Sequence, residues 1–344
     1  FLYSLSLPIC LVISLVVSEY LVRKARKEVT GIYKNSMKRI LFLIILGWAV
    51  LQGLKAQTDA ALSHYFMATA YYNPAAAGST EDLKMLALFN RQWVGFPNAQ
   101  QSFFVTADMP LKIGKTNHGI GIAAYTESIG LFQNTFVGAQ YAYKQKLFGG
   151  VLSGGLQIGF VTESFKADSI YIPQSPFHQQ EDEAFPKGTV SGMGLDLNVG
   201  LFYTHKNFYA GIGYTHVTSP EIQLEETVYT YIGGMLNFMG GYNIQLNNPL
   251  IVLKPSVFLL TDTKNYHLDV TARMEYNKMF NGGISWKMNE SVGILLGANI
   301  GKFNIGYSFG YPTTAIRNVS WGNHEVVVQF RLKLKKTKTG NTHQ

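Results

Sequence analysis

Apolar and polar residues alternate with a period of two through most of this chain. Residues 266–276, YHLDVTARMEY, show the pattern throughout: tyrosine, leucine, valine, alanine and methionine fill the even positions, and histidine, aspartate, threonine, arginine and glutamate the odd ones. A helix would scatter these charges around its surface, whereas a strand places them on one face. The pattern therefore predicts a β-strand with one apolar and one polar face.

The same alternation recurs along the chain, for example in residues 193–204 and 303–311. Strands of about ten residues account for the pattern and give about fourteen of them, an even number, as in bacterial outer-membrane barrels. The predicted strands are residues 84–93, 100–109, 117–126, 132–143, 150–161, 191–204, 207–216, 236–246, 250–260, 265–276, 280–288, 291–300, 303–311 and 324–334.

The connections between these strands alternate in length. Those after even-numbered strands are mostly tight, as at 204–207 and 277–279, whereas several after odd-numbered strands are long, as at 92–99, 162–189 and 217–235. Outer-membrane barrels have short periplasmic turns and longer outer loops. The asymmetry therefore predicts that both termini of the mature chain face the periplasm.

A soluble β-sandwich would also alternate, but its outward face would be rich in lysine, glutamate, threonine and serine. Here the uniform face is apolar and aromatic, and the mixed face carries the small residues. The chain has 34 glycines, 20 tyrosines and 22 phenylalanines, and only 15% of its residues are charged, against about 25% in soluble domains. We therefore predict an all-β fold, a transmembrane antiparallel β-barrel in the outer membrane with its apolar face in lipid.

Residues 37–56, MKRILFLIILGWAVLQGLKA, have the architecture of a bacterial export leader. Lys38 and Arg39 supply the basic start, residues 40–50 the apolar stretch, and Ala56 the small residue at the cleavage point. The sequence therefore predicts a signal peptide here.

The domain organisation follows from this leader. Residues 1–36 are an upstream extension, either sequence carried along by a misplaced start or an N-terminal membrane segment. The mature chain comprises an N-terminal periplasmic or plug-like segment over 57–82, the barrel over 83–334 and a basic tail over 335–344.

The net charge and the cysteine content exclude some classes of function. The formal net charge is +8, but the first 56 residues carry eight basic and two acidic side chains, which leaves the mature chain at +2. The electrostatic case for nucleic-acid binding therefore disappears. Since Cys10 is the only cysteine, the mature chain has no disulfide and no thiolate metal site.

Six segments together resemble the PorP/SprF family of outer-membrane proteins, which is associated with type IX secretion and gliding motility in Bacteroidetes. They are HYFMATAYYNPAAAG at 64–78, RQWVGFPNAQQSFFVTADMPL at 91–111, HGIGIAAYTESIG at 118–130, THVTSP at 215–220, LKPSVFLL at 253–260 and WGNHEVVVQF at 321–330. The resemblance implies an accessory that helps a secreted cell-surface protein leave through, or attach to, the type IX machinery. It brings no catalytic residue and no cofactor.

The segment at 64–78 precedes the first predicted strand and carries the candidate contacts Tyr65, Phe66, Tyr72, Asn73 and Pro74. Its aromatic residues could dock a partner. The alternative, which we favour, is a plug inside the barrel, with Asn73 and Pro74 interrupting a short helix.

Four further candidates lie near the predicted outer ends of the first and last strands. Arg91 and Trp93 could receive a substrate segment, although a tryptophan at the lipid boundary with an arginine nearby explains them equally simply. His324 and Glu325 fit either partner contact or packing at the start of the last strand.

Four charged residues, Lys254, Arg273, Glu275 and Lys287, fall on the predicted inward face of neighbouring strands. They form either a selectivity ladder for solutes or an ion network that fills the lumen.

Motifs of enzymes and metal sites give no positive signal. The sequence has no G-x-S-x-G, no H-E-x-x-H and no phosphate-binding loop, and HQQEDE at 178–183 lacks the glycine and spacing of a calcium loop. We therefore expect no catalytic, cofactor or metal site. The main alternative function is a passive porin or small-solute transporter; a membrane-embedded hydrolase comes third.

Overall fold

The computed structural model describes residues 59–166, 188–225 and 228–334. Contacts divide the chain into two units, Phe1–Leu54 and Lys55–Gln344, and all described residues belong to the second. The signal peptide predicted over 37–56, the loop motif at 178–183 and the basic tail from 335 lie outside the described residues.

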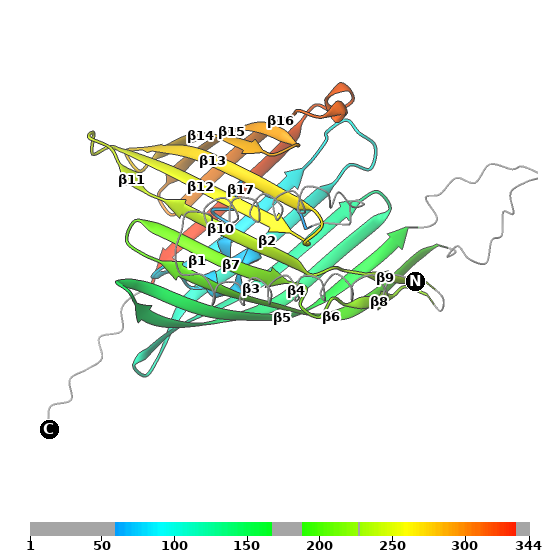
Figure 1. Cartoon of the computed structure of the whole chain (residues 1–344), viewed down its shortest axis with the longest axis horizontal. Helices are drawn as coiled ribbons and strands as arrows, with labels where there is room; N and C mark the ends of the chain where they lie inside the picture. Colours follow the sequence, from blue (N-terminus) through cyan, green and yellow to red (C-terminus); the bar gives the residue numbers. More distant parts are fainter. Residues whose placement is uncertain (1–58, 167–187, 226–227, 335–344) are drawn as a thin grey trace, which may run out of the picture. The chain divides into compact units, whose positions relative to one another are not determined.

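Fourteen antiparallel strands form one closed ring (Figure 1). Each strand pairs with its neighbours along the chain, β1 pairs with β17, and pairing of β10 with β12 completes the circle. The predicted barrel is confirmed, with its number of strands. The ring strands are β1 (Asp82–Arg91), β2 (Gln101–Ile113), β3 (Thr116–Ile129), β4 (Phe132–Leu147), β5 (Gly150–Lys166), β6 (Thr189–Thr204), β7 (Phe208–Thr215), β10 (Met235–Tyr242), β12 (Ile251–Thr261), β13 (Tyr266–Tyr276), β14 (Phe280–Lys287), β15 (Ser291–Ile300), β16 (Phe303–Pro312) and β17 (Asn323–Lys333).

Short elements complete the described fold. A hairpin of β8 (Glu221–Gln223) and β9 (Tyr229–Tyr231) forms a separate small sheet between β7 and β10, and β11 (Ile244–Gln245) extends the edge of β12. A short helix, α3 (Thr69–Tyr72), and a 3₁₀ turn, η1 (Pro74–Ala76), precede β1, and a second turn, η3 (Ala315–Asn318), precedes β17. No helix among the described residues is long and apolar enough to cross a membrane.

The two ends of the barrel differ in their connections. We call the end with the tight turns at 114–115, 148–149, 277–279 and 301–302 the short-turn end. The opposite end, the long-loop end, carries the connections 92–100, 216–234 and 313–322 and the connection between β5 and β6. β1 starts and β17 ends at the short-turn end, as the alternating loop lengths predict.

Several strand boundaries differ from the sequence prediction: β2, β3 and β4, for example, end three or four residues later than predicted. β7 ends at Thr215 because His216 has a φ of 54°, which turns the chain out of the strand. The strand predicted over 236–246 is interrupted after Tyr242. β5 continues to Lys166 and shortens the loop predicted over 162–189.

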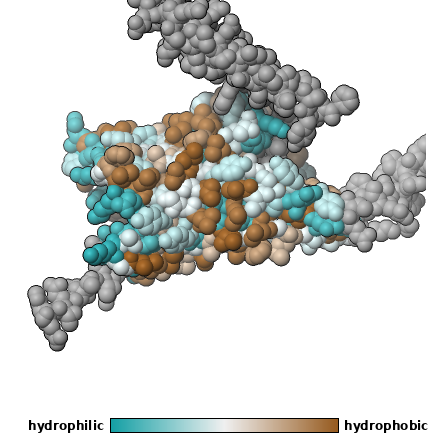
Figure 2. All heavy atoms as spheres, turned by 60° about the horizontal axis from the view of Figure 1, so that its bottom comes forward, coloured by the Kyte–Doolittle hydropathy of each residue, from teal (hydrophilic) through white to brown (hydrophobic). Residues whose placement is uncertain are grey.

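Alternation along the strands produces the two faces of the barrel. The odd positions of β13, including Asp269 and Thr271, are buried or half-buried, whereas the outward Ile284 on β14 and Leu296 on β15 remain 66% and 59% exposed. Apolar side chains gather across the middle of the face shown in Figure 2, with hydrophilic ones toward the two ends. This outward apolar belt is the surface that contacts lipid.

Aromatic side chains border the belt at the short-turn end. Phe208 packs against Tyr203, with ring centroids 5.7 Å apart, and stacks on Tyr242 at 6.4 Å. Tyr276 and Phe280 lie outward at the same end. Such rings, apolar with polar tips, are typical of the membrane interface.

The cost of placing a charge on the outward face should depend on depth. Leu296→Arg, at the middle of β15, is expected to destabilise the barrel by about 2–4 kcal/mol, and Ile300→Arg, on the same face at the strand end, by only about 0–1 kcal/mol. Both side chains are outward and similarly exposed, at 59% and 63%. Unfolding by denaturant in lipid vesicles measures the difference. Equal costs would mean that this face does not contact lipid.

Candidate functional site

A segment of the chain, residues 59–81, runs inside the ring of strands; we call it the inner segment. Every residue from Ala70 to Gly78 is buried. Its polar partners come from strands all around the ring, which places it within the lumen. These partners are Asp108, Gln140, Leu201, Ile212, Thr215, His216, Asn237, Ser256, Lys287 and Glu325.

The inner segment crosses the lumen from one end to the other. Asp59, the first described residue, hydrogen-bonds to Thr215 at the long-loop end of β7, with Oδ2 3.2 Å from Thr215 Oγ1. Gly78, near its other end, donates its N–H to Asp108 on β2 at 2.7 Å, and β1 begins four residues later at Asp82. The prediction that both termini face the periplasm therefore concerns residues beyond the described ones, and Asp59 itself lies at the long-loop end.

Asn73 and Pro74 form the corner of the inner segment. The helix α3 ends at Tyr72, and Pro74 opens the turn η1, because proline tolerates the first position of such a turn but not the interior of a helix. The Asn73 side chain accepts a hydrogen bond from Ala75 N at 3.0 Å and donates to the carbonyl oxygens of Leu201 at 2.9 Å and Ile212 at 3.1 Å. One asparagine thus holds the corner and ties it to β6 and β7.

Glycines on the inward face of β5 and β6 make room for this corner. A Cβ atom on Gly200 would overlap Asn73 Oδ1, and one on Gly155 would overlap the backbone of Pro74 and Ala75. The sequence places glycine at these inward positions because the backbone of the inner segment lies directly against the strand.

Aromatic rings anchor the segment on the opposite side of the lumen. Tyr65 stacks on Phe258 of β12, with centroids 5.2 Å apart, and donates its hydroxyl to Ser256 Oγ at 2.9 Å. The guanidinium of Arg273 lies 3.2 Å from the ring centroid of Phe66, a cation–π contact. These contacts hold the segment against β12 and β13.

Charged side chains bind the backbone near the start of the segment. Glu325 of β17, which is 2% exposed, accepts hydrogen bonds from the N–H groups of Ser63 and His64 at 2.8 Å and lies 2.6 Å from His64 Nδ1. Lys287 of β14 donates to the Ala61 carbonyl at 2.8 Å. Two charges that would be costly if buried alone are therefore satisfied by the inner segment.

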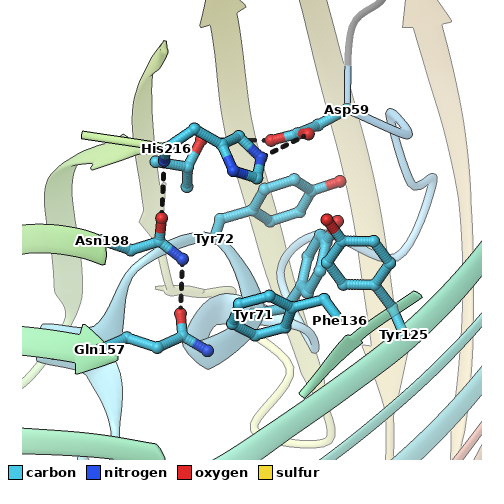
Figure 3. Close-up of a pocket in the computed structure, with 9 residues that line it drawn as sticks. Asp59, Tyr71, Tyr72, Tyr125, Phe136, Gln157, Asn198 and His216 are labelled. Carbon is cyan, nitrogen blue, oxygen red and sulfur yellow. Dashed lines mark hydrogen bonds and ion pairs between the residues drawn. The ribbon is translucent and has the colours of Figure 1, made fainter. Parts of the chain in front are cut away.

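A buried ion cluster holds Asp59 at the long-loop end. His216 lies between two carboxylates, with Nε2 3.1 Å from Asp59 and Nδ1 3.0 Å from Asp196. Figure 3 shows its ring turned toward Asp59. The backbone N–H of His216 donates to Asn198 at 2.7 Å, and Asn198 donates to Gln157 at 2.8 Å.

The charge of His216 follows from these neighbours. Burial lowers the pKa of the imidazole, but the carboxylates of Asp59 and Asp196 outweigh burial and raise the pKa to about 10. His216 is therefore protonated at neutral pH and offsets the charge of Asp196, which is fully buried. The cavity beside this cluster, lined by Tyr71, Tyr125 and others, has room for about one water molecule.

The hairpin β8–β9 folds onto the inner face of β5 and β6 at the long-loop end. Ile222 is fully buried, and a Cβ atom on Gly192 would overlap the backbone of the hairpin. Thr230 donates to Glu163 on β5 at 3.1 Å. The hairpin thus occupies part of the lumen that the inner segment does not occupy.

The sequence-predicted residues fall into two groups. Tyr65, Phe66, Tyr72, Asn73, Pro74 and Glu325 meet inside the lumen. Arg91 is exposed at the end of β1, Trp93 follows it with a φ of 49° and donates its N–H to Asn323 at 2.9 Å, and His324 faces outward, 2.8 Å from the hydroxyl of Tyr307. The structure does not bring these three residues to the inner segment.

Lys254, Arg273, Glu275 and Lys287 all face inward but do not form one network. Lys254 and Glu275 form an ion pair at 2.7 Å. Arg273 lies over Phe66, and Lys287 binds the inner segment near the opposite end of the barrel. A continuous ladder of charge along the lumen is therefore not present among these four residues.

Sequence analysis did not single out several residues that hold the inner segment, notably Asp59, Gln140, Asp196, His216 and Asn237. Gln140 and Asn237 donate to the carbonyls of Ala70 and Tyr72 at 2.7 and 2.9 Å. The sequence did offer one signal for these two residues, because both fall on the inward-facing side of a predicted strand. Within the part of the chain that the structure describes, no group of three or more potential ligands could hold a metal ion.

A closed fourteen-strand barrel with an apolar, aromatic outer face defines this chain as an integral β-barrel protein of the outer membrane. Residues 54–330 match the model of the type IX secretion system membrane protein family PorP/SprF. The chain belongs to this family, as the resemblance of its sequence motifs indicates. No curated protein sequence matches the chain.

Solved structures with a similar arrangement are outer-membrane barrels of low sequence identity. The toluene transporter TbuX of Ralstonia pickettii is 12% identical over 83% of this chain and 96% of its own, with a TM-score of 0.47. TodX of Pseudomonas putida, also a toluene transporter, is 9% identical over 83% and 97%, with a TM-score of 0.45. The outer membrane protein Omp33 of Acinetobacter baumannii is 8% identical over 73% and 99%, at 0.43.

Adding a methyl group under the corner of the inner segment should destabilise the barrel. Gly200→Ala is expected to cost about 1–3 kcal/mol through overpacking against Asn73. Gly240→Ala, on β10, is the matched control because the nearest atom to its Cβ would be 3.6 Å away. Unfolding in detergent with denaturant measures both. Equal stability of the two variants would show that Asn73 does not lie against β6.

Removal of the imidazole at position 216 should leave Asp196 buried without its counter-charge. His216→Ala is expected to cost about 3–5 kcal/mol near neutral pH. Because the pKa of His216 is raised in the fold, its contribution is complete below the ordinary value near 6.5 and is lost as the pH rises through about 10.

The matched control is His205→Ala, because His205 is exposed in a turn at the other end of the barrel. Unfolding free energies of the wild type and both variants, measured at pH 8 and pH 11, give the comparison. A wild-type advantage over His216→Ala that is unchanged at pH 11 would contradict the charge assignment.

Proposed function

We propose that this protein is a non-enzymatic accessory of the type IX secretion system that assists the export or surface attachment of a secreted protein. Membership of the PorP/SprF family supports a role as an outer-membrane component of that system. The observation that carries the finer proposal is the inner segment, which crosses the lumen and is hydrogen-bonded to strands around the ring. A barrel whose interior is occupied by its own chain acts through its surfaces.

Residues 59–81 are proposed to act as a plug. The segment binds strands on every side of the ring, and the hairpin β8–β9 occupies the space beside it at the long-loop end. Withdrawal of the segment would leave Glu325 and Lys287 buried without their partners, which is costly.

The two ends of the barrel are proposed to have different partners. The short-turn end, where β17 ends, faces the periplasm and the trans-envelope machinery. The long-loop end faces outward and meets the exported protein. This orientation follows the usual distribution of short periplasmic turns and longer outer loops.

Deletion of the gene tests the accessory role. Secreted adhesins should fail to reach the cell surface and should accumulate inside the envelope, while general outer-membrane composition stays unchanged. Re-expression of the wild-type chain is the control for polar effects on neighbouring genes. Normal surface display of all type IX substrates in the deletion strain would contradict the proposal.

Conductance in planar bilayers distinguishes the accessory from the alternative of a passive porin. The full-length protein should show no steady single-channel current, because the inner segment fills the lumen. Removal of residues 59–78 should produce stable openings, and Gly240→Ala should remain silent. Steady conductance of the wild type would favour the porin.

A further inference from the structure

The exposed charges of the barrel differ between its two ends. At the long-loop end they have both signs, for example Arg91 and Glu221. At the short-turn end Glu81 is the one exposed carboxylate among the described residues. The turns there carry the exposed lysines Lys115, Lys206, Lys278 and Lys302. The short-turn end is therefore a positively charged surface.

Part of this positive charge lies on the inner face of the wall. Four further exposed basic residues, at the ends of β2, β4 and β17, have the parity of inward side chains; we call them the basic arc. They are Lys112, Lys146, Arg331 and Lys333. Arg331, for example, follows the buried Gln329 at a spacing of two, which places both on one face. The basic arc thus borders the opening of the barrel.

The strand register adds two more basic residues to this inner face. Arg331 lies directly opposite Lys84 of β1. Lys112 lies opposite Asn117 of β3, which in turn lies opposite Lys144 of β4. Lys84 forms an ion pair with Asp108 at 3.2 Å, but no ion pair between described residues includes a member of the basic arc. Like charges held this close repel each other in the free barrel.

The ammonium group of Lys144 has no partner. The residue is only 8% exposed, and its Nζ makes no hydrogen bond with any described residue. Burial of a charge without a counter-charge costs free energy. Lys144 lies two residues before the exposed Lys146 on the same face of β4. An anion that enters at the opening would therefore meet Lys146 first and Lys144 behind it.

The inward position of the basic arc indicates which kind of anion it fits. Lipid headgroups surround the outer face of the barrel, and inward side chains point away from them. A second copy of this chain, docked end to end, would bring like charges together. A polypeptide that carries several carboxylates complements the basic arc and reaches inside the rim.

We propose that the short-turn end binds an acidic segment of a partner protein along the inner face of β2–β4. Aspartate or glutamate side chains of the segment pair with Lys112 and Lys146 at the rim, and one carboxylate reaches Lys144. Recognition of acidic segments by clustered basic side chains is a common mode of peptide binding. The proposal deepens the proposed function and rests on it for the partner, a component of the machinery in the periplasm.

A ten-residue peptide that alternates glutamate and serine is the probe for the purified full-length barrel in detergent. Its control alternates glutamine and serine. Titration calorimetry should show binding of the acidic peptide, at least about tenfold tighter than that of the control. Binding should weaken as salt is added, because exposed charges are screened. Equal binding of the two peptides, or no binding of the acidic one, would overturn the proposal.

Two double variants separate the inner face from the net charge of this end. Lys112→Gln with Lys146→Gln removes two exposed charges from inward positions. Lys206→Gln with Lys278→Gln removes two exposed charges from turns outside the basic arc. The first pair should weaken binding of the acidic peptide by at least about tenfold, and the second by about threefold or less. Equal weakening would mean attraction to net charge alone and would overturn the proposal.

Lys144→Met tests the buried ammonium. Methionine keeps the length of the side chain and removes the unpaired charge, so the free barrel should unfold at a higher denaturant concentration. The same change should weaken binding of the acidic peptide by about threefold or more. A lower denaturant midpoint with unchanged peptide binding would show that this chain itself neutralises Lys144, and it would overturn the proposal.

A soluble anionic lipid tests the membrane as the alternative occupant. Dihexanoylphosphatidylglycerol, below the concentration at which it forms micelles, should not displace the acidic peptide at equal concentration. Displacement would assign the basic arc to lipid headgroups and would overturn a protein partner.

A cellular measurement separates this proposal from the proposed function. If gene deletion blocks surface display, Lys112→Gln with Lys146→Gln should reduce it, with the Lys206 and Lys278 pair normal and both variants at wild-type levels in the outer membrane. Normal display with the inward pair would overturn the acidic segment alone. Normal display in the deletion strain, with the peptide still bound by the purified barrel, would overturn the accessory role alone.

Discussion

Every backbone N–H and C=O group in the hydrocarbon layer must find a partner within protein, because no water is present to bind it. In this chain a ring of fourteen antiparallel strands meets that requirement, and the pairing of β10 with β12 closes it. Since successive residues of a strand point to opposite sides, closure also sorts the sequence into an apolar surface toward lipid and a polar surface toward the lumen.

A ring of this size encloses space, and residues 59–81 of the same chain run through it. Inward glycines such as Gly155 and Gly200 admit the backbone of Asn73 and Pro74, and inward charges such as Glu325 and Lys287 bind the backbone of the segment. The strands around the inner segment thus bind it through both packing and polar contacts. Glu325 and Lys287 are tolerated there because both bind the inner segment.

The fold was predictable from sequence because strand alternation is a local property. The eleven residues of β13 place Arg273 and Glu275 on the inward face without reference to any other part of the chain. The contacts across the lumen were not predictable in this way. Asp59 and His216 are 157 positions apart. A period of two shows which face of the sheet a residue lies on, but it does not show which residue it contacts across the lumen. The hairpin β8–β9 was missed because each strand has only three residues and lies inside the ring.

A role as a plug requires residues 59–78 to stay fixed in the barrel interior. Hydrogen exchange of the full-length protein in detergent, resolved to single amides, tests it most directly, because the N–H groups of Ser63, His64 and Gly78 are bound to buried carboxylates. If the segment is held in the lumen, these amides should exchange as slowly as those in the middle of β5. Exchange of the three amides at the rate of an unstructured chain would show that the segment is not held in the lumen.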